Sequence, residues 1–330
     1  MCKSSIQECH KGFLKRDIEL HISKTVIATT SSFARESQEP LELMENEGLK
    51  IILNPWGRKL EGEELSKLMK DHRPVGLLAG TEPLTREVLD AAKDHLRIIS
   101  RVGVGWDNVD REAAGQMGIR VYRTSGVLTQ AVAELTIGLI LSALRSISSG
   151  DRIIRQGKWY KTMGGLLSGK IVGIIGFGHI GQRVGELVTA FGAKVLYYDP
   201  QPMDTTWAQA VTLPELLSHA EIISIHASGR EKILGPNELK KLCKQGVILV
   251  NTARGGLIDE VALQECLKNG KVNFACLDVF EDEPYCGPLC SLENVILTPH
   301  VGSYAREARV LMERTAVENL LNGLREVGIL

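Results

Sequence analysis

The chain has 330 residues, of which 44% are hydrophobic and 24% charged, and its formal net charge is −1. This near balance gives no reason to expect a nucleic-acid partner, which usually needs a clustered basic face. No apolar run approaches the roughly 18 residues that indicate a membrane span. The length predicts two globular domains of roughly 150 residues each.

The cysteines are odd in number and irregularly spaced, which argues against a disulfide framework and favours reduced thiols in a cytoplasmic protein. They are Cys2, Cys9, Cys243, Cys266, Cys276, Cys286 and Cys290. Only Cys286 and Cys290 form a close pair of interest, and no second His or Cys pair is near them, so we expect no metal site. Residues 1–24 lack the apolar core of a secretory signal, and we interpret them as an N-terminal extension.

The first part of the chain alternates short apolar runs with helical patterns. Strands are expected at Thr25–Ala28, Lys50–Leu53, Val75–Leu78, Ile98–Arg101 and Arg120–Tyr122, with helices such as Pro40–Glu47, Glu61–Lys70 and Thr85–Ala92 between them. This order predicts parallel strands joined by crossover helices, and five such strands make a small flavodoxin-like unit.

Residues 130–156 carry one long helical pattern with a broad apolar stripe. The stripe consists of Leu135, Leu139, Ile140, Leu144 and Ile147, widened by Val132, Ile137 and Leu141. An apolar surface this wide is covered by something other than water. Two interpretations stay open: the helix is buried inside its own domain, or it forms the interface of a homodimer.

A second series of strands and helices follows. Strands are expected at Lys170–Ile175, Lys194–Tyr198, Ala210–Thr212, Glu221–His226, Val247–Asn251, Val272–Leu277 and Asn294–Leu297, and a last helix at Tyr304–Leu324. The whole chain is therefore predicted to be an α/β protein built on parallel sheets.

The run from Ile171 to Gly181 is the most informative local feature, because Gly176, Gly178 and Gly181 form the pattern G-x-G-x-x-G. It follows an apolar strand and precedes a helical pattern, as a dinucleotide-binding unit requires. The first glycine allows the tight turn, the second lets the backbone approach the pyrophosphate, and the third permits close packing of helix on strand. The helix N-terminus supplies free N–H groups for the phosphates.

Two neighbours of this loop complete the cofactor prediction. Asp199 ends the next strand, close to the expected spacing, and its carboxylate suits the ribose hydroxyls but repels a 2′-phosphate, so we expect NAD rather than NADP. His179 and Ile180 lie inside the loop and are included among the cofactor-binding residues. The His179 side chain can touch a phosphate, although a position facing solvent is favoured.

Three further segments end predicted strands and carry an arginine, acids and a histidine. They are Val250–Gly256, Leu277–Pro284 and Leu297–Gly302. In an open α/β sheet the carboxyl ends of strands frame the ligand crevice. An arginine there can clamp a carboxylate and polarise a carbonyl, a histidine can deliver a proton, and an acid can orient the imidazole and favour its charged form. These groups suit the reduction of a carbonyl.

With these motifs in this order, the chain resembles the D-isomer-specific 2-hydroxyacid dehydrogenases, from about Lys24 to Glu326. The resemblance implies a hydride transfer between NAD and C2 of a small-molecule 2-hydroxy or 2-oxo acid. It implies Arg254 as the arginine that binds and polarises the substrate, His300 as the acid/base, and Glu283 as the partner of that histidine.

The resemblance also implies the remaining site residues. The substrate loop would comprise Arg101, Val102, Gly103, Val104 and Gly105, with the amides around Val104 and Gly105 holding the carboxylate. On the cofactor side, Thr129 would lie near the nicotinamide, Asp278 would bind its carboxamide, and His226, Ala253 and Gly302 would line the nucleotide.

The family divides the chain discontinuously. Residues 25–123 and 305–330 would form the substrate domain, and residues 124–304 would form the NAD-binding domain inserted into it. The helix over 130–156 would make a homodimer, and catalysis would need the two domains to close on the substrate.

The identity of the acid is the open question. The chain looks most like short phosphoglycerate dehydrogenases, for which 3-phosphoglycerate is the expected substrate and Arg101 the candidate for its phosphate. Against this, Glu82 would repel a phosphate, and Gly126–Thr129 looks more like hydroxypyruvate and glyoxylate reductases. The alternatives are therefore such a reductase, a dehydrogenase of another acid such as a phosphonate, or, remotely, an NAD-sensing corepressor-like binding protein.

Overall fold

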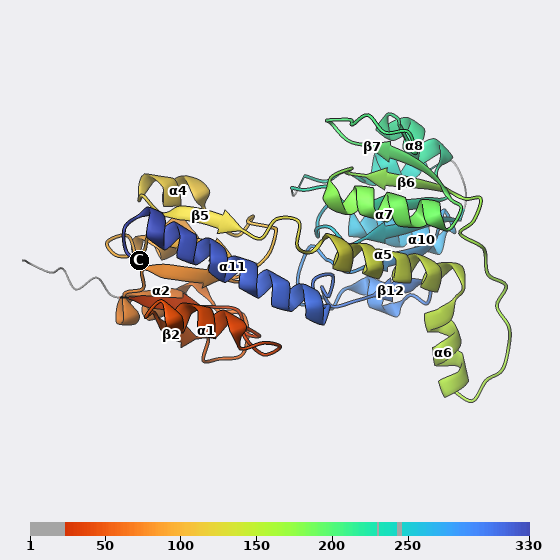
Figure 1. Ribbon diagram of the computed structural model, residues 1–330. Coiled ribbons are helices and arrows are strands. Elements are labelled where there is room, and N and C mark those ends of the chain that lie inside the picture. Colours follow the sequence, from red (N-terminus) through yellow and green to blue (C-terminus); the bar gives the residue numbers. More distant parts are fainter. Residues whose placement is uncertain (1–23, 230, 243–245) are drawn as a thin grey trace, which may run out of the picture.

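The computed structural model describes residues 24–229, 231–242 and 246–330. It shows two lobes side by side, each built on a parallel sheet with helices against it (Figure 1). The N-terminal extension, apart from Lys24, lies outside the described residues, as do Cys2, Cys9 and Cys243. The four described cysteines are free thiols, with Cys266 and Cys276 buried and Cys286 and Cys290 exposed.

The first lobe contains a five-stranded sheet. Its strands are β1 (Thr25–Ala28), β2 (Lys50–Leu53), β3 (Gly76–Ala79), β4 (Ile98–Arg101) and β5 (Arg120–Arg123). They are all parallel in the order β2-β1-β3-β4-β5. The three inner strands are buried at every residue, whereas the edge strands β2 and β5 are partly exposed. This is the strand order of flavodoxin-like folds, so the predicted unit is confirmed.

The helices of the first lobe come from both ends of the chain. They are α1 (Glu39–Asn46), α2 (Gly62–His72), α3 (Arg86–Asp90), α4 (Arg111–Gln116) and α11 (Arg306–Glu326). The last of these packs on β3, β4, β5 and α1, so the end of the chain returns to the first lobe (Figure 1). The Ser100 hydroxyl anchors it by donating a hydrogen bond to the Ala316 carbonyl at 2.7 Å.

The second lobe contains a seven-stranded sheet. Its strands are β6 (Ile171–Ile175), β7 (Lys194–Tyr198), β8 (Ala208–Ala210), β9 (Ile222–Ile225), β10 (Val247–Asn251), β11 (Val272–Leu277) and β12 (Val295–Leu297). They are all parallel in the order β12-β11-β10-β9-β6-β7-β8. The strand order reverses between β6 and β9, which is where doubly wound sheets of this kind bind their ligands.

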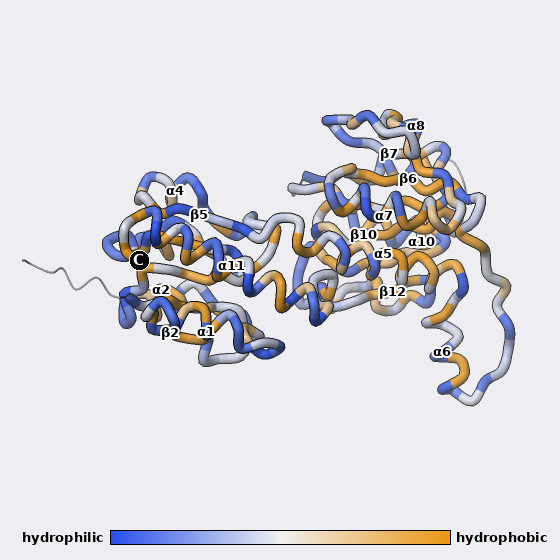
Figure 2. Tube along the Cα trace, in the orientation of Figure 1, coloured by the Kyte–Doolittle hydropathy of each residue, from blue (hydrophilic) through white to orange (hydrophobic). Residues whose placement is uncertain are grey.

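The helices of the second lobe, apart from the one over Ile147–Arg155, cover both faces of this sheet. They are α5 (Thr129–Leu144), α6 (Ile147–Arg155), α7 (His179–Ala190), α8 (Leu213–His219), α9 (Pro236–Lys240) and α10 (Glu260–Lys268), with a short 3-10 helix at Pro288–Ser291. Two buried apolar clusters lie between helices and sheet, one of them formed by side chains of α5, α7 and the strands they cover. Figure 2 shows the apolar residues concentrated along these strands and helices.

The single helix expected over residues 130–156 is wrong. The chain forms α5 and α6, which are bent by 62° relative to each other. Ser146 between them has a φ of 51°, a left-handed conformation that ends the first helix. Serine favours turns and caps over helix interiors, and the break falls at Ser146, whereas Ser148, Ser149 and Gly150 lie inside α6.

Beyond the bend, residues 146–164 form an arm that leaves the second lobe and returns to it (Figure 1). The Gly165 amide closes the excursion by donating to the Leu144 carbonyl at 2.9 Å. Helix α5 itself is buried in its own lobe, which agrees with the first of the two interpretations of its apolar stripe. Among the described helices, none alone is long and apolar enough to cross a membrane; α5 and α6 meet the length and composition criteria only together, across their bend.

Candidate active site

The predicted catalytic residues come together because the carboxyl ends of parallel strands share one edge of a sheet. Arg254 follows β10, Glu283 follows β11 and His300 follows β12. The loop after β4 of the first lobe approaches them, because Asp107 in that loop forms an ion pair with Arg254. Two segments far apart in the sequence thus meet where the two lobes face each other.

His300 and Glu283 form a hydrogen-bonded pair. The His300 Nδ1 lies 2.9 Å from one carboxylate oxygen of Glu283, and the other oxygen accepts from the Phe280 amide at 3.1 Å. Burial alone would raise the pKa of Glu283, but the hydrogen bond and charge of His300, the Phe280 amide and the nearby Lys59 outweigh it and lower the pKa. The carboxylate is therefore ionised, and the imidazole keeps its Nε2 for a substrate.

The loop that carries His300 is held by Asp278. This buried carboxylate accepts hydrogen bonds from the Thr298 hydroxyl at 2.5 Å, the Val301 amide at 2.8 Å and the Gly302 amide at 2.8 Å. His300 itself has a φ of 51°, a left-handed conformation that is uncommon outside glycine. A strained residue of this kind persists where its surroundings fix it, and here three hydrogen bonds to one carboxylate do so.

Arg254 is fixed from both lobes. Its Nε donates to Asp107 at 3.1 Å, and its Nη1 donates to the Ala253 carbonyl at 2.7 Å. The Asn251 side chain, at the end of β10, accepts from the Ala253 amide at 3.0 Å and donates to the Arg254 carbonyl at 2.8 Å. This turn directs the guanidinium toward the first lobe. A planar guanidinium can bind a carboxylate there through two parallel hydrogen bonds.

The guanidinium of Arg254 lies directly against the predicted substrate loop. A Cβ atom at Gly105 would overlap Nη2 of Arg254, so only glycine permits this close approach. Within the described parts of the chain, the amides of Val104 and Gly105 donate to no protein acceptor. The amide of Gly103, by contrast, is bound to the Thr124 hydroxyl at 3.1 Å. Two free amides beside a guanidinium can hold a substrate carboxylate.

Arg101, the residue expected to bind a substrate phosphate, is buried. Its side chain is buried, with the residue 8% exposed, and Nη1 donates to the Val102 carbonyl. Burial lowers the pKa of Arg101 to about 10, and the charge of the buried Glu82 opposes that effect. The guanidinium thus lies beneath the substrate loop.

The glycine loop between β6 and α7 fits a dinucleotide. Gly176 has a φ of 90°, and a Cβ there would lie 2.5 Å from the Ala227 amide nitrogen. A Cβ at Gly178 would meet nothing within 4 Å, so there is open space beside the amides at the start of α7. That space and the N-terminus of a helix are what a pyrophosphate needs. Asp199 lies against the same loop and accepts from the Phe177 amide at 2.7 Å.

The other cofactor-side residues lie around this loop and at the ends of neighbouring strands. His179 and Ile180 begin α7, with His179 exposed, and Thr129 begins α5. His226 follows β9, and its Nε2 lies 2.8 Å from the Ser224 hydroxyl. Burial lowers the pKa of His226 to about 3, so the ring is neutral at ordinary pH and contributes no charge toward a nucleotide.

Three residues at the site have functional contacts that the sequence did not predict. Asp107 lies two residues beyond the predicted substrate loop, and only the fold shows that it pairs with Arg254. Lys59 follows β2, and its positive charge helps to lower the pKa of Glu283. Glu82 was recognised as a charge that would repel phosphate, whereas its burial and its hydrogen bonds needed the structure.

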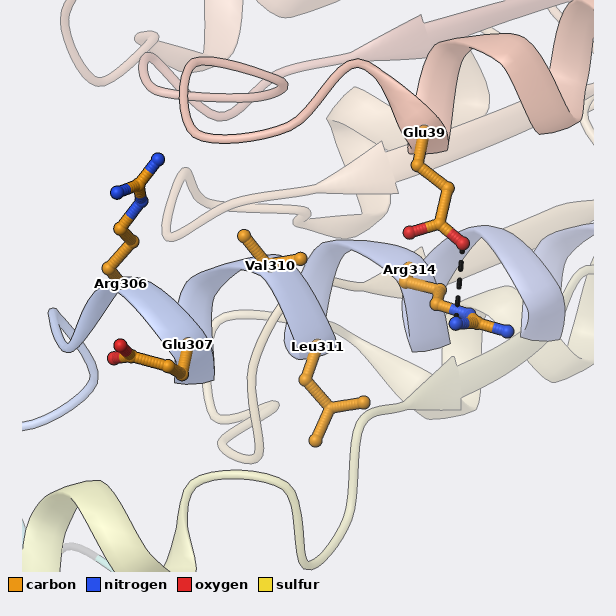
Figure 3. Close-up of a pocket in the computed structure, with 6 residues that line it drawn as sticks. All are labelled: Glu39, Arg306, Glu307, Val310, Leu311 and Arg314. Atoms are coloured by element: carbon orange, nitrogen blue, oxygen red, sulfur yellow. Dashed lines mark ion pairs between the residues drawn. The ribbon is translucent and has the colours of Figure 1, made fainter.

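A shallow hollow with a volume of about 440 Å³ lies elsewhere, between the start of α1 and the first half of α11 (Figure 3). It is lined by Glu39, Arg306, Glu307, Val310, Leu311 and Arg314, with an ion pair of 3.3 Å between Arg314 and Glu39. None of the predicted site residues lines it, so it does not belong to the candidate active site.

Comparisons with known proteins agree with this geometry. Residues 137–302 match the family described as D-isomer specific 2-hydroxyacid dehydrogenase, NAD binding domain. The chain is 39% identical over 297 residues to a hydroxypyruvate reductase of Thermotoga maritima, covering 87% of this chain and 94% of that enzyme. It is 37% identical, again over 87% of its length, to a D-3-phosphoglycerate dehydrogenase of Archaeoglobus fulgidus, of which it spans only 55%.

A solved structure gives the same result. The crystal structure of a glyoxylate reductase from Paecilomyes thermophila superposes with a TM-score of 0.83 at 30% identity, covering 93% of this chain and 97% of that one. The match over residues 137–302 includes the glycine loop, the arginine after β10 and the paired acid and histidine. The chain belongs to the D-isomer specific 2-hydroxyacid dehydrogenases, whose second lobe binds NAD.

Proposed function

We propose that this protein reduces a short 2-oxo acid to the D-2-hydroxy acid with NADH. The observation that supports this most is the His300–Glu283 pair, held at 2.9 Å on the lobe that carries Arg254, with the free amides of Val104 and Gly105 opposite. A proton donor, a carboxylate clamp and a carbonyl-polarising arginine are what this reaction asks of a protein.

Each residue has a defined part in the proposed reaction. The amides of Val104 and Gly105 and one side of the Arg254 guanidinium bind the substrate carboxylate, which orients C2. The other side of the guanidinium polarises the C2 carbonyl, and protonated His300 donates its Nε2 proton to the carbonyl oxygen. Glu283 keeps the imidazole in place through Nδ1 and favours its charged form. Bound NADH supplies the hydride that C2 accepts.

The cofactor-side residues support NADH over NADPH. Asp199 lies at the end of β7 against the glycine loop, where a carboxylate can accept from ribose hydroxyls and would repel a 2′-phosphate. Gly176, Gly178, His179, Ile180 and Gly181 would surround the pyrophosphate, and Thr129, His226, Ala253, Asp278 and Gly302 would line the rest of the cofactor. The proposal thus assigns NAD to residues 124–304 and the acid to residues 25–123 and 305–330.

For the acid, we favour glyoxylate or hydroxypyruvate, which carry no charge at the end distal to the carboxylate. Arg101, expected as the phosphate ligand, is buried beneath the loop and faces the buried Glu82. A phosphate would meet this cation only after displacing the loop and would then be close to a carboxylate. The similarity to a hydroxypyruvate reductase and a glyoxylate reductase agrees with this choice.

Phosphohydroxypyruvate, the partner of 3-phosphoglycerate and the acid expected from the sequence, is the second candidate. Similarity to a D-3-phosphoglycerate dehydrogenase favours it, although this chain spans about half of that enzyme. Lys59 is an exposed cation whose charge reaches Glu283, so it is available to a distal phosphate. The same reasoning would admit another phospho or phosphono 2-hydroxy acid.

One experiment separates these candidates. NADH oxidation is measured in parallel with glyoxylate, hydroxypyruvate, 3-phosphohydroxypyruvate and pyruvate, and kcat/KM is compared. We expect the unphosphorylated acids to match or exceed the phosphorylated one. A kcat/KM about 100-fold higher for 3-phosphohydroxypyruvate, worth roughly 2.7 kcal/mol, would contradict our choice of acid and favour the phosphoglycerate type. Tight NADH binding without turnover of any acid would favour the corepressor-like alternative.

We also propose that the protein is a homodimer, with the arm rather than α5 as the contact. The arm and the residue that follows its return expose six large apolar side chains, an arrangement typical of a surface that another chain covers. They are Ile147, Ile154, Trp159, Tyr160, Met163 and Leu166.

The free thiols of the described cysteines support the expected cytoplasmic location, where thiols stay reduced.

A further inference from the structure

A buried polar network lies directly beneath the substrate loop. Glu82, 1% exposed, follows β3 and accepts hydrogen bonds from the Thr29 hydroxyl and from the Gly80 amide, the latter at 2.9 Å. Asn108, within the loop after β4, donates to the Glu82 carbonyl at 2.6 Å. The ends of β1, β3 and β4 are therefore tied together around one buried carboxylate.

Arg101 brings the opposite charge to the same place. Its guanidinium packs against Gly103, since a Cβ at that glycine would lie 2.6 Å from Nη1 and 3.0 Å from Cζ. Gly103 has a φ of 149°, which glycine alone adopts readily. The cation is thus seated under the loop whose next two residues, Val104 and Gly105, carry the free amides.

Two features distinguish Arg101 from a side chain that only fills space in the core. Its Nε is buried without a hydrogen-bond partner among the described residues, although buried donors are nearly always paired. Among the described residues, Glu82 and Arg101 also form no direct ion pair, although the Glu82 carboxylate affects the pKa of Arg101 more than any other charge does. Much of the positive charge under the loop is therefore left uncompensated by direct contact.

We propose that Arg101 and Glu82 are positioning residues that together set the affinity of the loop for the substrate carboxylate. Arg101 holds the loop from below and adds positive charge behind the amides of Val104 and Gly105. Glu82 fixes the surrounding strand ends and offsets part of that charge. The inference rests on the proposed function, and it assigns Arg101 to the carboxylate end that all 2-oxo acids share.

This arrangement has a physical consequence for different substrates. A buried charge acts strongly on a nearby anion because little water screens it. The carboxylate is bound equally before and during hydride transfer, so losing this support raises KM and leaves kcat nearly unchanged. A phosphate ligand would behave differently, because its loss would affect phosphorylated acids alone.

The test compares Arg101→Gln, Arg101→Lys and Glu82→Gln with the wild type. KM and kcat are measured for glyoxylate, hydroxypyruvate and 3-phosphohydroxypyruvate, and the dissociation constant of oxamate, an unreactive analogue, is measured by calorimetry with NADH present. Arg97→Gln, at the opposite end of β4, is the matched control and should leave all values unchanged. Thermal unfolding of each variant reports on folding.

We expect Arg101→Gln to raise KM for every acid and the oxamate dissociation constant by about tenfold, with kcat within threefold, while Arg101→Lys restores part of the loss. Glu82→Gln should move both constants the opposite way, tightening them by about threefold. An effect of Arg101→Gln on the phosphorylated acid alone, or a lowered melting temperature with unchanged constants, would overturn the proposal. So would a Glu82→Gln variant that binds oxamate more weakly.

Two outcomes keep this test separate from the proposed function. If the wild type turns over none of the acids, the proposed reaction fails, yet the oxamate constants still decide whether Arg101 and Glu82 act on a bound carboxylate. If Arg101→Gln does not fold, Arg101→Lys and Glu82→Gln provide the same comparison, because one keeps the positive charge and the other changes only the negative one.

Discussion

In the proposed reaction, proton transfer depends on two side chains that reach each other from separate loops. His300 has a left-handed backbone, and the amides of Val301 and Gly302 next to it donate to Asp278, so its ring is presented in one orientation to Glu283. The lowered pKa of Glu283 keeps its carboxylate ionised below the ordinary range of glutamate. As the pH falls, the pair is therefore retained until the pH drops through that lowered value.

The first prediction concerns this pair. His300→Ala should lower kcat for reduction by roughly 10²–10⁴-fold, the usual size of a general acid–base contribution. Glu283→Gln should keep the geometry but remove the negative charge that stabilises the charged imidazole, so kcat should fall, by less than in His300→Ala. Steady-state kinetics of both variants and the wild type at the same pH tests this, and near-wild-type turnover in His300→Ala would exclude the mechanism.

At the scale of elements, α11 is the last helix along the chain, yet it packs on the first lobe, and buried contacts fix it there. Glu313 on its buried face accepts from the Ala34 amide at 2.9 Å and from Arg309, whose side chain is only 10% exposed. Burial raises the pKa of Glu313, while the Ala34 amide and Arg309 oppose the rise. The pair is buried on both sides, so removing one partner leaves the other uncompensated.

The second prediction follows from that burial. Glu313→Ala should lower the free energy of unfolding by about 3–5 kcal/mol, because it strands the Arg309 charge and the Ala34 amide. Glu318→Ala, on the exposed face of the same helix, is the control and should cost about 0–1 kcal/mol. Urea denaturation measures both variants. Similar losses for the two would mean that the buried pair does not anchor α11.

In the proposed homodimer, the arm is the element that would contact the second chain. The sequence predicted one interface helix over residues 130–156, but α5 ends at Leu144. The exposed apolar side chains of the arm all lie beyond the bend that follows α5. Helix α5 is occupied by contacts within its own lobe. The exposed apolar side chains that a partner would cover lie in α6 and in the chain that returns from it.

The third prediction is that charges on the arm prevent dimerisation. Ile154→Asp combined with Trp159→Asp should give a monomer by light scattering, whereas the wild type should have twice the chain mass, because burying carboxylates in an apolar contact is costly. Val261→Asp, at another exposed apolar residue outside the arm, is the matched control. A wild-type monomer, or a double variant that stays dimeric, would contradict this assignment.

For the whole molecule, two connections join the lobes: the chain from β5 into α5 and the chain from β12 into α11. The candidate site lies between the two lobes, with the predicted substrate loop on one and the His300–Glu283 pair on the other. The ion pair of 3.1 Å between Asp107 and Arg254 is the contact at the site that spans both lobes. Such an arrangement favours closure when a substrate binds both lobes at once.

The fourth prediction is that ligands close the molecule. NADH with oxamate should lower the radius of gyration measured by small-angle X-ray scattering, because oxamate would contact the loop and Arg254 together. NADH alone should have a smaller effect, since its expected ligands lie on one lobe. Arg254→Gln should abolish the additional change, and an unchanged radius in the wild type with both ligands would rule out closure of this kind.

The sequence determined those features that depend on short, local patterns. Alternating apolar runs located the strands to within a few residues, and the glycine loop, Asp199, Arg254, Glu283 and His300 were predicted as site residues because each belongs to a motif at the end of a strand. The fold class follows from the same alternation, since consecutive β–α units can only form parallel sheets.

The tertiary structure decided whatever depends on residues far apart in the chain. The bend at Ser146, the pairing of Asp107 with Arg254 and the burial of Arg101 beside Glu82 have no local signature. A strand-end arginine looks the same in sequence whether it faces solvent or a buried carboxylate. Only the packing of β1, β3 and β4 against one another fixes which it is, because burial and charge at that point come from the neighbouring strands.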